Sequence, residues 1–120
     1  MWTKGGTSMP DIISNMLLGF ARQVKTLLDG KLSKIMVYGS YARGDYRENS
    51  DVDVMILVKL TESEIKKIAP TIYDIAYDIE LEKGIHISVV IKNKEQFEYW
   101  VDTLPFYRNV NEEGVEINAG

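Results

Sequence analysis

The chain has 120 residues, of which 45% are hydrophobic and 27% charged, a composition typical of a single globular domain and not of a disordered or collagen-like chain. A formal net charge of −4 argues against a domain that grips nucleic acid by neutralising its phosphates. The sequence contains no cysteine, which excludes disulfides, thiolate metal sites and cysteine nucleophiles. Since no apolar run approaches the length of a membrane span, we expect a cytoplasmic protein that does not enter a membrane.

The first half of the chain predicts one helix followed by two strands. Residues 1–9, which include Gly5 and Gly6, are expected to form a flexible tail or an expression remnant, and residues 10–117 a domain. Apolar residues at three- and four-residue intervals predict a helix over 11–29. Short runs rich in β-branched residues predict strands over 34–38 and 52–58, on either side of the polar segment 39–50.

The second half predicts three helices and one strand. Thr61 and Glu64 have the spacing of a capping box, so a helix should begin there, and Pro70 should kink or split it. Beyond it we expect a strand over 85–91, a helix capped by Asn93, and a short helix from Pro105 to Gly114. This order of elements predicts a single α/β domain with a small mixed sheet of about three core strands and helices packed on it.

The polar segment 39–53, GSYARGDYRENSDVD, contains the residues suited to chemistry. Gly39 allows the backbone to turn sharply and approach a ligand, and Ser40 adds a hydroxyl group and an N–H group that favour anions. Asp51 and Asp53 are two residues apart at the start of a strand, so their carboxylates share one face and repel each other unless a cation lies between them. Mg²⁺ is the natural cation, because it binds through one or two carboxylates and completes its shell with water and substrate phosphates.

A bound cation also explains how an acidic chain could hold a triphosphate. The metal would bridge the nucleotide to Asp51 and Asp53, while Ser40, Arg43 and nearby N–H groups contact the outer phosphates. These residues also have simpler interpretations, since Asp51 and Asp53 can be a solvated strand start. Arg43 can pair with Asp45 or Glu48 on the surface.

This segment resembles the minimal nucleotidyltransferases of the DNA polymerase β-like superfamily, in which Gly-Ser is followed by ten residues and then by Asp-x-Asp. Looser similarity extends over about residues 10–117 and includes the closing PFYRNVNEEGVEI, which resembles the MntA-type antitoxins of HEPN/MNT toxin–antitoxin pairs. The residues that match the motif are Gly39, Ser40, Arg43, Gly44, Ser50, Asp51 and Asp53.

The resemblance implies a polymerase β-like fold and a role for each matching residue. Asp51 and Asp53 would be the catalytic metal ligands, for two Mg²⁺ ions, while Gly39 and Ser40 bind phosphate and Arg43 contacts the triphosphate. The implied reaction is transfer of AMP from ATP, or of a nucleotidyl group from another nucleoside triphosphate, to a hydroxyl group. The implied acceptor is a protein partner, of the helical HEPN type if the chain is an antitoxin.

The sequence departs from the family at one position, because the strand over 85–91 lacks the third carboxylate and offers Ser88 where it is expected. We therefore expect weaker metal binding and slow transfer, unless Glu80 or Glu82 supplies the third position. Two alternatives remain at this point: a non-catalytic module that binds a nucleotide or a partner, and transfer to a small molecule such as an aminoglycoside.

Other residues near the motif are less informative. His86, the single histidine, is interpreted as an edge residue of the predicted third strand rather than a base. Tyr41 and Tyr46 lie beside the motif and are candidates for lining a nucleotide pocket.

Overall fold

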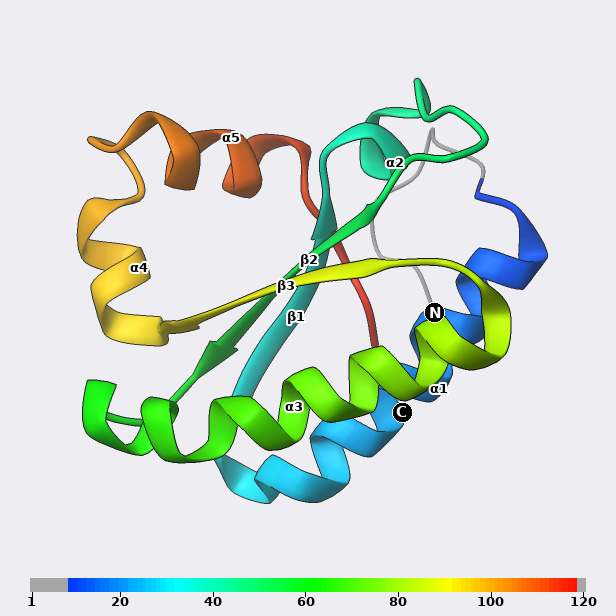
Figure 1. Ribbon diagram of the computed structural model, residues 1–120. Coiled ribbons are helices and arrows are strands. Elements are labelled where there is room, and N and C mark those ends of the chain that lie inside the picture. Colours follow the sequence, from blue (N-terminus) through cyan, green and yellow to red (C-terminus); the bar gives the residue numbers. More distant parts are fainter. Residues whose placement is uncertain (1–8, 119–120) are drawn as a thin grey trace.

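The computed structural model describes residues 9–118 of the chain, which form one α/β unit (Figure 1). In these residues no helix is long and apolar enough to cross a membrane. The elements in chain order are α1 (Asp11–Leu28), a 3₁₀ turn (Asp29–Lys31), β1 (Leu32–Tyr38), α2 (Ser40–Arg43), β2 (Val52–Val58), α3 (Glu62–Lys83), β3 (Ile87–Asn93), α4 (Lys94–Trp100), α5 (Pro105–Glu113) and β4 (Val115–Glu116).

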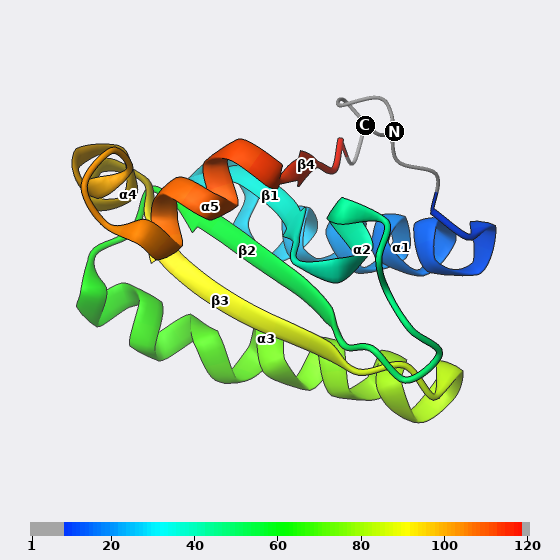
Figure 2. The same cartoon turned by 90° about the horizontal axis from the view of Figure 1, so that it is seen from above.

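The strands form one mixed sheet in the order β3-β2-β1-β4. β1 runs antiparallel to both of its neighbours, whereas β2 and β3 are parallel. The expected mixed α/β architecture is confirmed, with a two-residue fourth strand in addition to the three that were predicted. The parallel pairing brings the starts of β2 and β3 to the same end of the sheet, where α2 also lies (Figure 2).

Alternation along the strands divides the apolar residues between two faces of the sheet. On β2, Val52, Val54 and Ile56 face the main core, into which α1 and α3 pack. Met55 and Leu57 point to the opposite face, where they join a smaller cluster with Phe97 of α4 and Val110 of α5. Figure 1 shows α1 and α3 side by side across the first face. Because its side chain follows the same alternation, Asp53 emerges on the face of the smaller cluster.

α3 is one continuous helix from Glu62 to Lys83, so of the two expected effects of Pro70, a kink or a split, the split is wrong. The capping box is present: the Thr61 hydroxyl accepts from the Glu64 N–H, and Glu64 accepts from the Thr61 N–H. Pro70 is exposed, so its ring occupies the solvent side of the helix, while Ile65 and Ile72 on either side of it are buried. Burial of this face and the N-terminal cap together outweigh the missing hydrogen bond.

The remaining helices begin where the sequence predicts. The Asn93 side chain accepts from the Gln96 N–H at the start of α4, and Pro105 occupies the first turn of α5. β3 begins at Ile87, two residues later than predicted, although the His86 carbonyl already accepts from the Val52 N–H.

The predicted tail falls almost entirely outside the described residues. Positions 1–8 lie beyond what the structure describes, whereas Met9 packs against the main core. Met9 therefore belongs with the folded residues, contrary to its assignment to the tail.

Candidate active site

The turn between β1 and α2 places the Gly39 backbone directly against Asp53. Gly39 has a φ of 76°, in the left-handed region that favours glycine, and it precedes the single turn of α2. A Cβ atom at this position would overlap the Oδ2 atom of Asp53. Glycine is therefore required here for two reasons, the backbone conformation and the approach of the carboxylate.

Asp51 and Asp53 lie at the start of β2 as predicted, Asp51 exposed and Asp53 half-buried. The pKa of Asp53 is raised, first by partial burial and then by the negative charge of Asp51, with a smaller contribution from Glu113. Arg43 and His86 act in the opposite direction. The two aspartates are thus close enough to repel each other, and a cation between them would relieve that repulsion.

The donor set fits Mg²⁺ only in a site that the substrate completes. No group of three or more histidine, aspartate or glutamate side chains among residues 9–118 is arranged to hold a metal ion. Mg²⁺ commonly binds through one or two carboxylates and takes its other oxygens from water and phosphates. Asp51 and Asp53 suffice for that kind of site, and no third protein ligand is needed for the fit.

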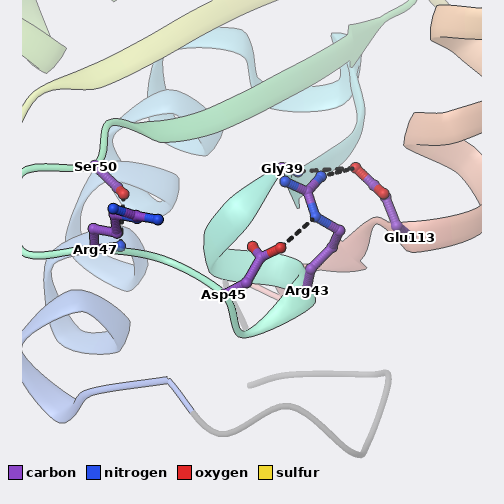
Figure 3. A network of polar contacts seen from close by, with 6 residues as sticks. All are labelled: Gly39, Arg43, Asp45, Arg47, Ser50 and Glu113. Carbon is purple, nitrogen blue, oxygen red and sulfur yellow. Dashed lines mark hydrogen bonds and ion pairs between the residues drawn. The ribbon is translucent and has the colours of Figure 1, made fainter.

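Arg43 lies beside the Gly39 turn, but its guanidinium group is engaged by two carboxylates. Its Nε atom donates to Oδ2 of Asp45 at 3.2 Å, and its Nη1 atom donates to Oε1 of Glu113 at 3.1 Å (Figure 3). These partners, Asp45 first, raise the pKa of Arg43. The pairing with Asp45 that the sequence allowed is therefore real, and Glu113 is an addition that the sequence did not suggest.

Glu113 is the main site residue that sequence reasoning missed. Its Oε1 atom accepts from the Gly39 N–H at 3.2 Å as well as from Arg43, although it lies 74 residues away from Gly39 in the sequence. The one local signal is an acidic residue in the last turn of a helix, where the negative end of the helix dipole disfavours it.

The remaining motif residues shape the loop around the turn. The Ser40 carbonyl accepts from the N–H groups of Gly44 and Asp45, which closes the single turn of α2. The Ser50 hydroxyl accepts from the Arg47 N–H at 2.7 Å and so fixes the approach to Asp51. Because α2 has only four residues, the donors near a phosphate would be individual groups such as the Ser40 hydroxyl rather than a helix dipole.

Ser88 lies where the sequence analysis expected it. Its Cα is the register partner of Asp53 in the parallel pairing of β2 and β3. Glu80, considered as a source of a third carboxylate, instead pairs with His86, whose Nδ1 lies 2.6 Å from the Glu80 Oε1. A cavity of about 400 Å³ between β3 and α3 is lined by residues that include Tyr77, Glu80, His86 and Ser88.

One tyrosine beside Asp53 was not predicted. Tyr38 is the register partner of Asp53 across β1 and β2, and burial together with the Asp53 charge raises its pKa to about 12. Its hydroxyl group therefore stays protonated at neutral pH. Tyr41 is buried in the main core and stacks on Tyr46 with ring centroids 4.4 Å apart, so Tyr41 does not line an open pocket.

The chain is similar in sequence to known proteins. The family model described as nucleotidyltransferase domain matches residues 18–116. A Methanocaldococcus jannaschii protein named "Putative protein adenylyltransferase MJ0141" is 38% identical over 105 residues, which cover 88% of this chain and 98% of that protein.

Two solved structures share the fold. One, described as a toxin-antitoxin with AMP-PNP, superposes with a TM-score of 0.53 at 17% identity. The superposed residues cover 89% of this chain and 73% of the chain in that structure. The other, a mutant of the toxin-antitoxin MntA-HpeT, gives a TM-score of 0.52 at 15% identity with the same coverage. At such low sequence identity these structures show only that the fold is shared.

Proposed function

Because this chain belongs to the nucleotidyltransferase domain family, we propose that it transfers AMP from ATP to a hydroxyl group of a protein partner in a Mg²⁺-dependent reaction. The observation that carries the proposal is the contact between the Gly39 turn and Asp53. This contact puts the N–H and guanidinium donors suited to phosphate beside the carboxylates suited to a metal ion. A metal-bound triphosphate needs both kinds of group within one short span.

Each motif residue has a role in this proposal. Asp51 and Asp53 hold Mg²⁺, which supplies charge neutralisation and Lewis acidity when bound. The Gly39 N–H, the Ser40 hydroxyl and Arg43 hold the β- and γ-phosphates and so orient the α-phosphate toward the acceptor. Tyr38, protonated beside Asp53, offers one further donor on the same face of the sheet.

The reaction replaces one phosphorus–oxygen bond with another. The acceptor hydroxyl oxygen attacks the α-phosphorus, and the bond from that phosphorus to the oxygen bridging the β-phosphate breaks. Pyrophosphate leaves with the electron pair of the broken bond, and the hydroxyl proton passes to water or to a group on the acceptor. Ser88 cannot accept that proton as a carboxylate would, so we expect slow transfer.

A protein acceptor is supported by two observations. The net charge of −4 disfavours a nucleic acid acceptor, because its phosphates would be repelled. The M. jannaschii relative is named for adenylyl transfer to protein, and the structural neighbours are described as toxin-antitoxin complexes. A helical HEPN-type toxin is the partner that we propose to test first.

The proposal is tested with ATP labelled at the α-phosphate, incubated with the full chain, Mg²⁺ and lysate from its source. We expect label on a protein band that appears only when the chain is added, that is not seen with ATP labelled at the γ-phosphate, and that is lost with the Asp53→Asn variant. Label on a small molecule would instead indicate the aminoglycoside-type alternative. Label from the γ-phosphate that depends on the added chain would contradict adenylyl transfer.

One observation favours a second candidate, a non-catalytic module that binds Mg-nucleotide and occludes its partner. Ser88 stands opposite Asp53, where the resemblance leads us to expect a carboxylate that helps activate the nucleophile. Binding of Mg-ATP without transfer to any component of the lysate would support this candidate over the enzyme.

A further inference from the structure

Two of the three groups that the proposed function assigns to nucleotide phosphate, the Gly39 N–H and Arg43, are already bound by carboxylates. Oε1 of Glu113 accepts from the only N–H of Gly39 and from Nη1 of Arg43, at 3.2 and 3.1 Å (Figure 3). Asp45 takes the Nε atom of the same guanidinium group. Arg43 therefore supplies one positive charge to two carboxylates, and two of its five N–H donors are already used.

The position of Glu113 is not explained by its own helix. It is the last residue of α5, whose final turn has no basic side chain, and the partial negative charge at a helix C-terminus disfavours a carboxylate there. Its side chain is 28% exposed, so the contacts with Gly39 and Arg43 are partly shielded from water. These two contacts offset the unfavourable position, and they tie the end of α5 to the β1–α2 turn.

Glu113 also adds negative charge to the site where a polyphosphate would bind. It is among the groups that raise the pKa of Asp53, together with Asp51. A carboxylate oxygen and a phosphate oxygen accept hydrogen bonds from the same donors in similar geometry. Since Gly39 has a single N–H, a phosphate oxygen can take that donor only when Glu113 has released it.

We infer that Glu113 is a built-in competitor for the nucleotide's phosphates, so that a phosphate oxygen can bind the Gly39 N–H only when Glu113 is displaced from it. The inference rests on the proposed function only for the assignment of this turn to phosphate. A metal-bound triphosphate gains the Ser40 hydroxyl and the metal bridge to Asp51 and Asp53, and these contacts offset the loss of those that Glu113 gives up.

The test is the affinity of the full chain for inorganic tripolyphosphate with Mg²⁺, measured by calorimetry at 0.15 M salt, where charges far apart are largely screened. Glu113→Gln removes the charge and keeps the shape, and Glu113→Ala removes both. We expect each to bind the probe about tenfold more tightly than the wild type, in line with loss of a competing charge-assisted contact. Glu112→Gln, an exposed neighbour on the same helix, removes the same charge and should change affinity less than about twofold.

A second measurement does not depend on how the variants fold. In the wild type, the ¹³C resonance of the Glu113 carboxyl group and the ¹⁵N resonance of the Gly39 amide should shift together as Mg-tripolyphosphate is added. Three results would each overturn the inference. The first is unchanged or weaker binding by both folded Glu113 variants, and the second is equally tighter binding by Glu112→Gln. The third is a Glu113 resonance that does not shift when the probe is added.

The inference and the proposed function can fail separately. Tighter binding of tripolyphosphate by the Glu113 variants without label transfer from ATP would uphold the inference and remove the enzymatic proposal. Label transfer from ATP, combined with unchanged tripolyphosphate affinity in the Glu113 variants, would uphold the enzymatic proposal and overturn the inference. A wild type and variants that all fail to bind the probe would overturn the phosphate assignment on which both rest.

Discussion

Asp53 stands directly opposite Ser88 in the parallel pairing of β2 and β3, with Tyr38 as its partner on the other side. A third carboxylate at position 88 would therefore lie beside Asp53, but that position holds a serine. A single substitution can supply that carboxylate without altering the sheet.

Ser88→Asp should tighten binding of Mn²⁺, used as a Mg²⁺ analogue, on the order of tenfold, because ligand charge sets the affinity for hard cations. The added carboxylate would also repel Asp51 and Asp53, so the metal-free variant should unfold at a lower temperature and recover with Mn²⁺. Ser88→Asn is the matched control, with the same shape and no charge. If both variants bind Mn²⁺ like the wild type, Ser88 does not face the metal position.

Asp53→Asn should abolish Mg-dependent nucleotide binding and yet raise the melting temperature at pH 7. Because the pKa of Asp53 is raised in the folded chain, the unfolded chain loses this proton first. The free energy of unfolding therefore falls as the pH rises from 3.8, the ordinary pKa of an aspartate, through the raised pKa of Asp53 in the folded chain. Thermal unfolding at pH 4 and pH 7, with exposed Asp74→Asn as the control, measures this difference. A lower melting temperature for Asp53→Asn at pH 7 would contradict it.

Gly39→Ala should cost more stability than Gly84→Ala, although both glycines have positive φ, 76° and 72°. A Cβ at Gly84 meets no atom within 4 Å, whereas one at Gly39 overlaps the Asp53 carboxylate. Chemical denaturation should give about 1–2 kcal/mol for Gly84→Ala from the backbone alone, and a larger loss for Gly39→Ala. Gly39→Ala should also weaken Mg-ATP binding more than Ser40→Ala does. Equal losses of stability in the two variants would mean that the Asp53 side chain moves away from the new Cβ atom without destabilising the fold.

Glu80→Gln should lower the pKa of His86 toward its ordinary value of 6.5. The hydrogen bond from the His86 imidazole to Glu80 is the main cause of the raised pKa, and the charges of Asp51 and Asp53 add to it while partial burial opposes it. The stability that this pair contributes is present below pH 6.5 and is lost as the pH rises through the raised pKa. An NMR titration of the imidazole measures the shift, with Glu82→Gln as control. An unchanged His86 pKa in Glu80→Gln would contradict the pairing.

Pro70→Ala should stabilise the chain by about 1–3 kcal/mol, because Pro70 lies on the exposed side of α3 and leaves a backbone carbonyl without its helical partner. The melting temperature should rise by several degrees. Pro105→Ala serves as the control, since proline in the first turn of α5 removes no helical hydrogen bond. A loss of stability in Pro70→Ala as large as that in Pro105→Ala would contradict the prediction, because the entropy that the unfolded chain gains would then outweigh the recovered hydrogen bond.

Features that depend on neighbouring residues could be predicted from the sequence. The capping box of Thr61 and Glu64, the cap at Asn93 and the start of α5 at Pro105 are local, because the groups that interact lie within one helical turn. The turn at Gly39 and the carboxylates of Asp51 and Asp53 were found because their spacing reflects two adjacent strands. Alternation along the third strand placed Ser88 on the face of Asp53.

Features that depend on distant residues were decided by the tertiary structure. The contact of Glu113 with Gly39 joins segments 74 residues apart. No local sequence pattern indicates that the end of α5 packs beside the turn between β1 and α2. The same holds for Tyr38 beside Asp53 and for β4, whose two residues gain strand geometry only by pairing with β1. Pro70 shows the limit of local propensity, because burial of Ile65 and Ile72 keeps α3 intact across it. The sequence thus determined which groups are available for chemistry, and the packing of α5 against β1 decided which of them are already engaged.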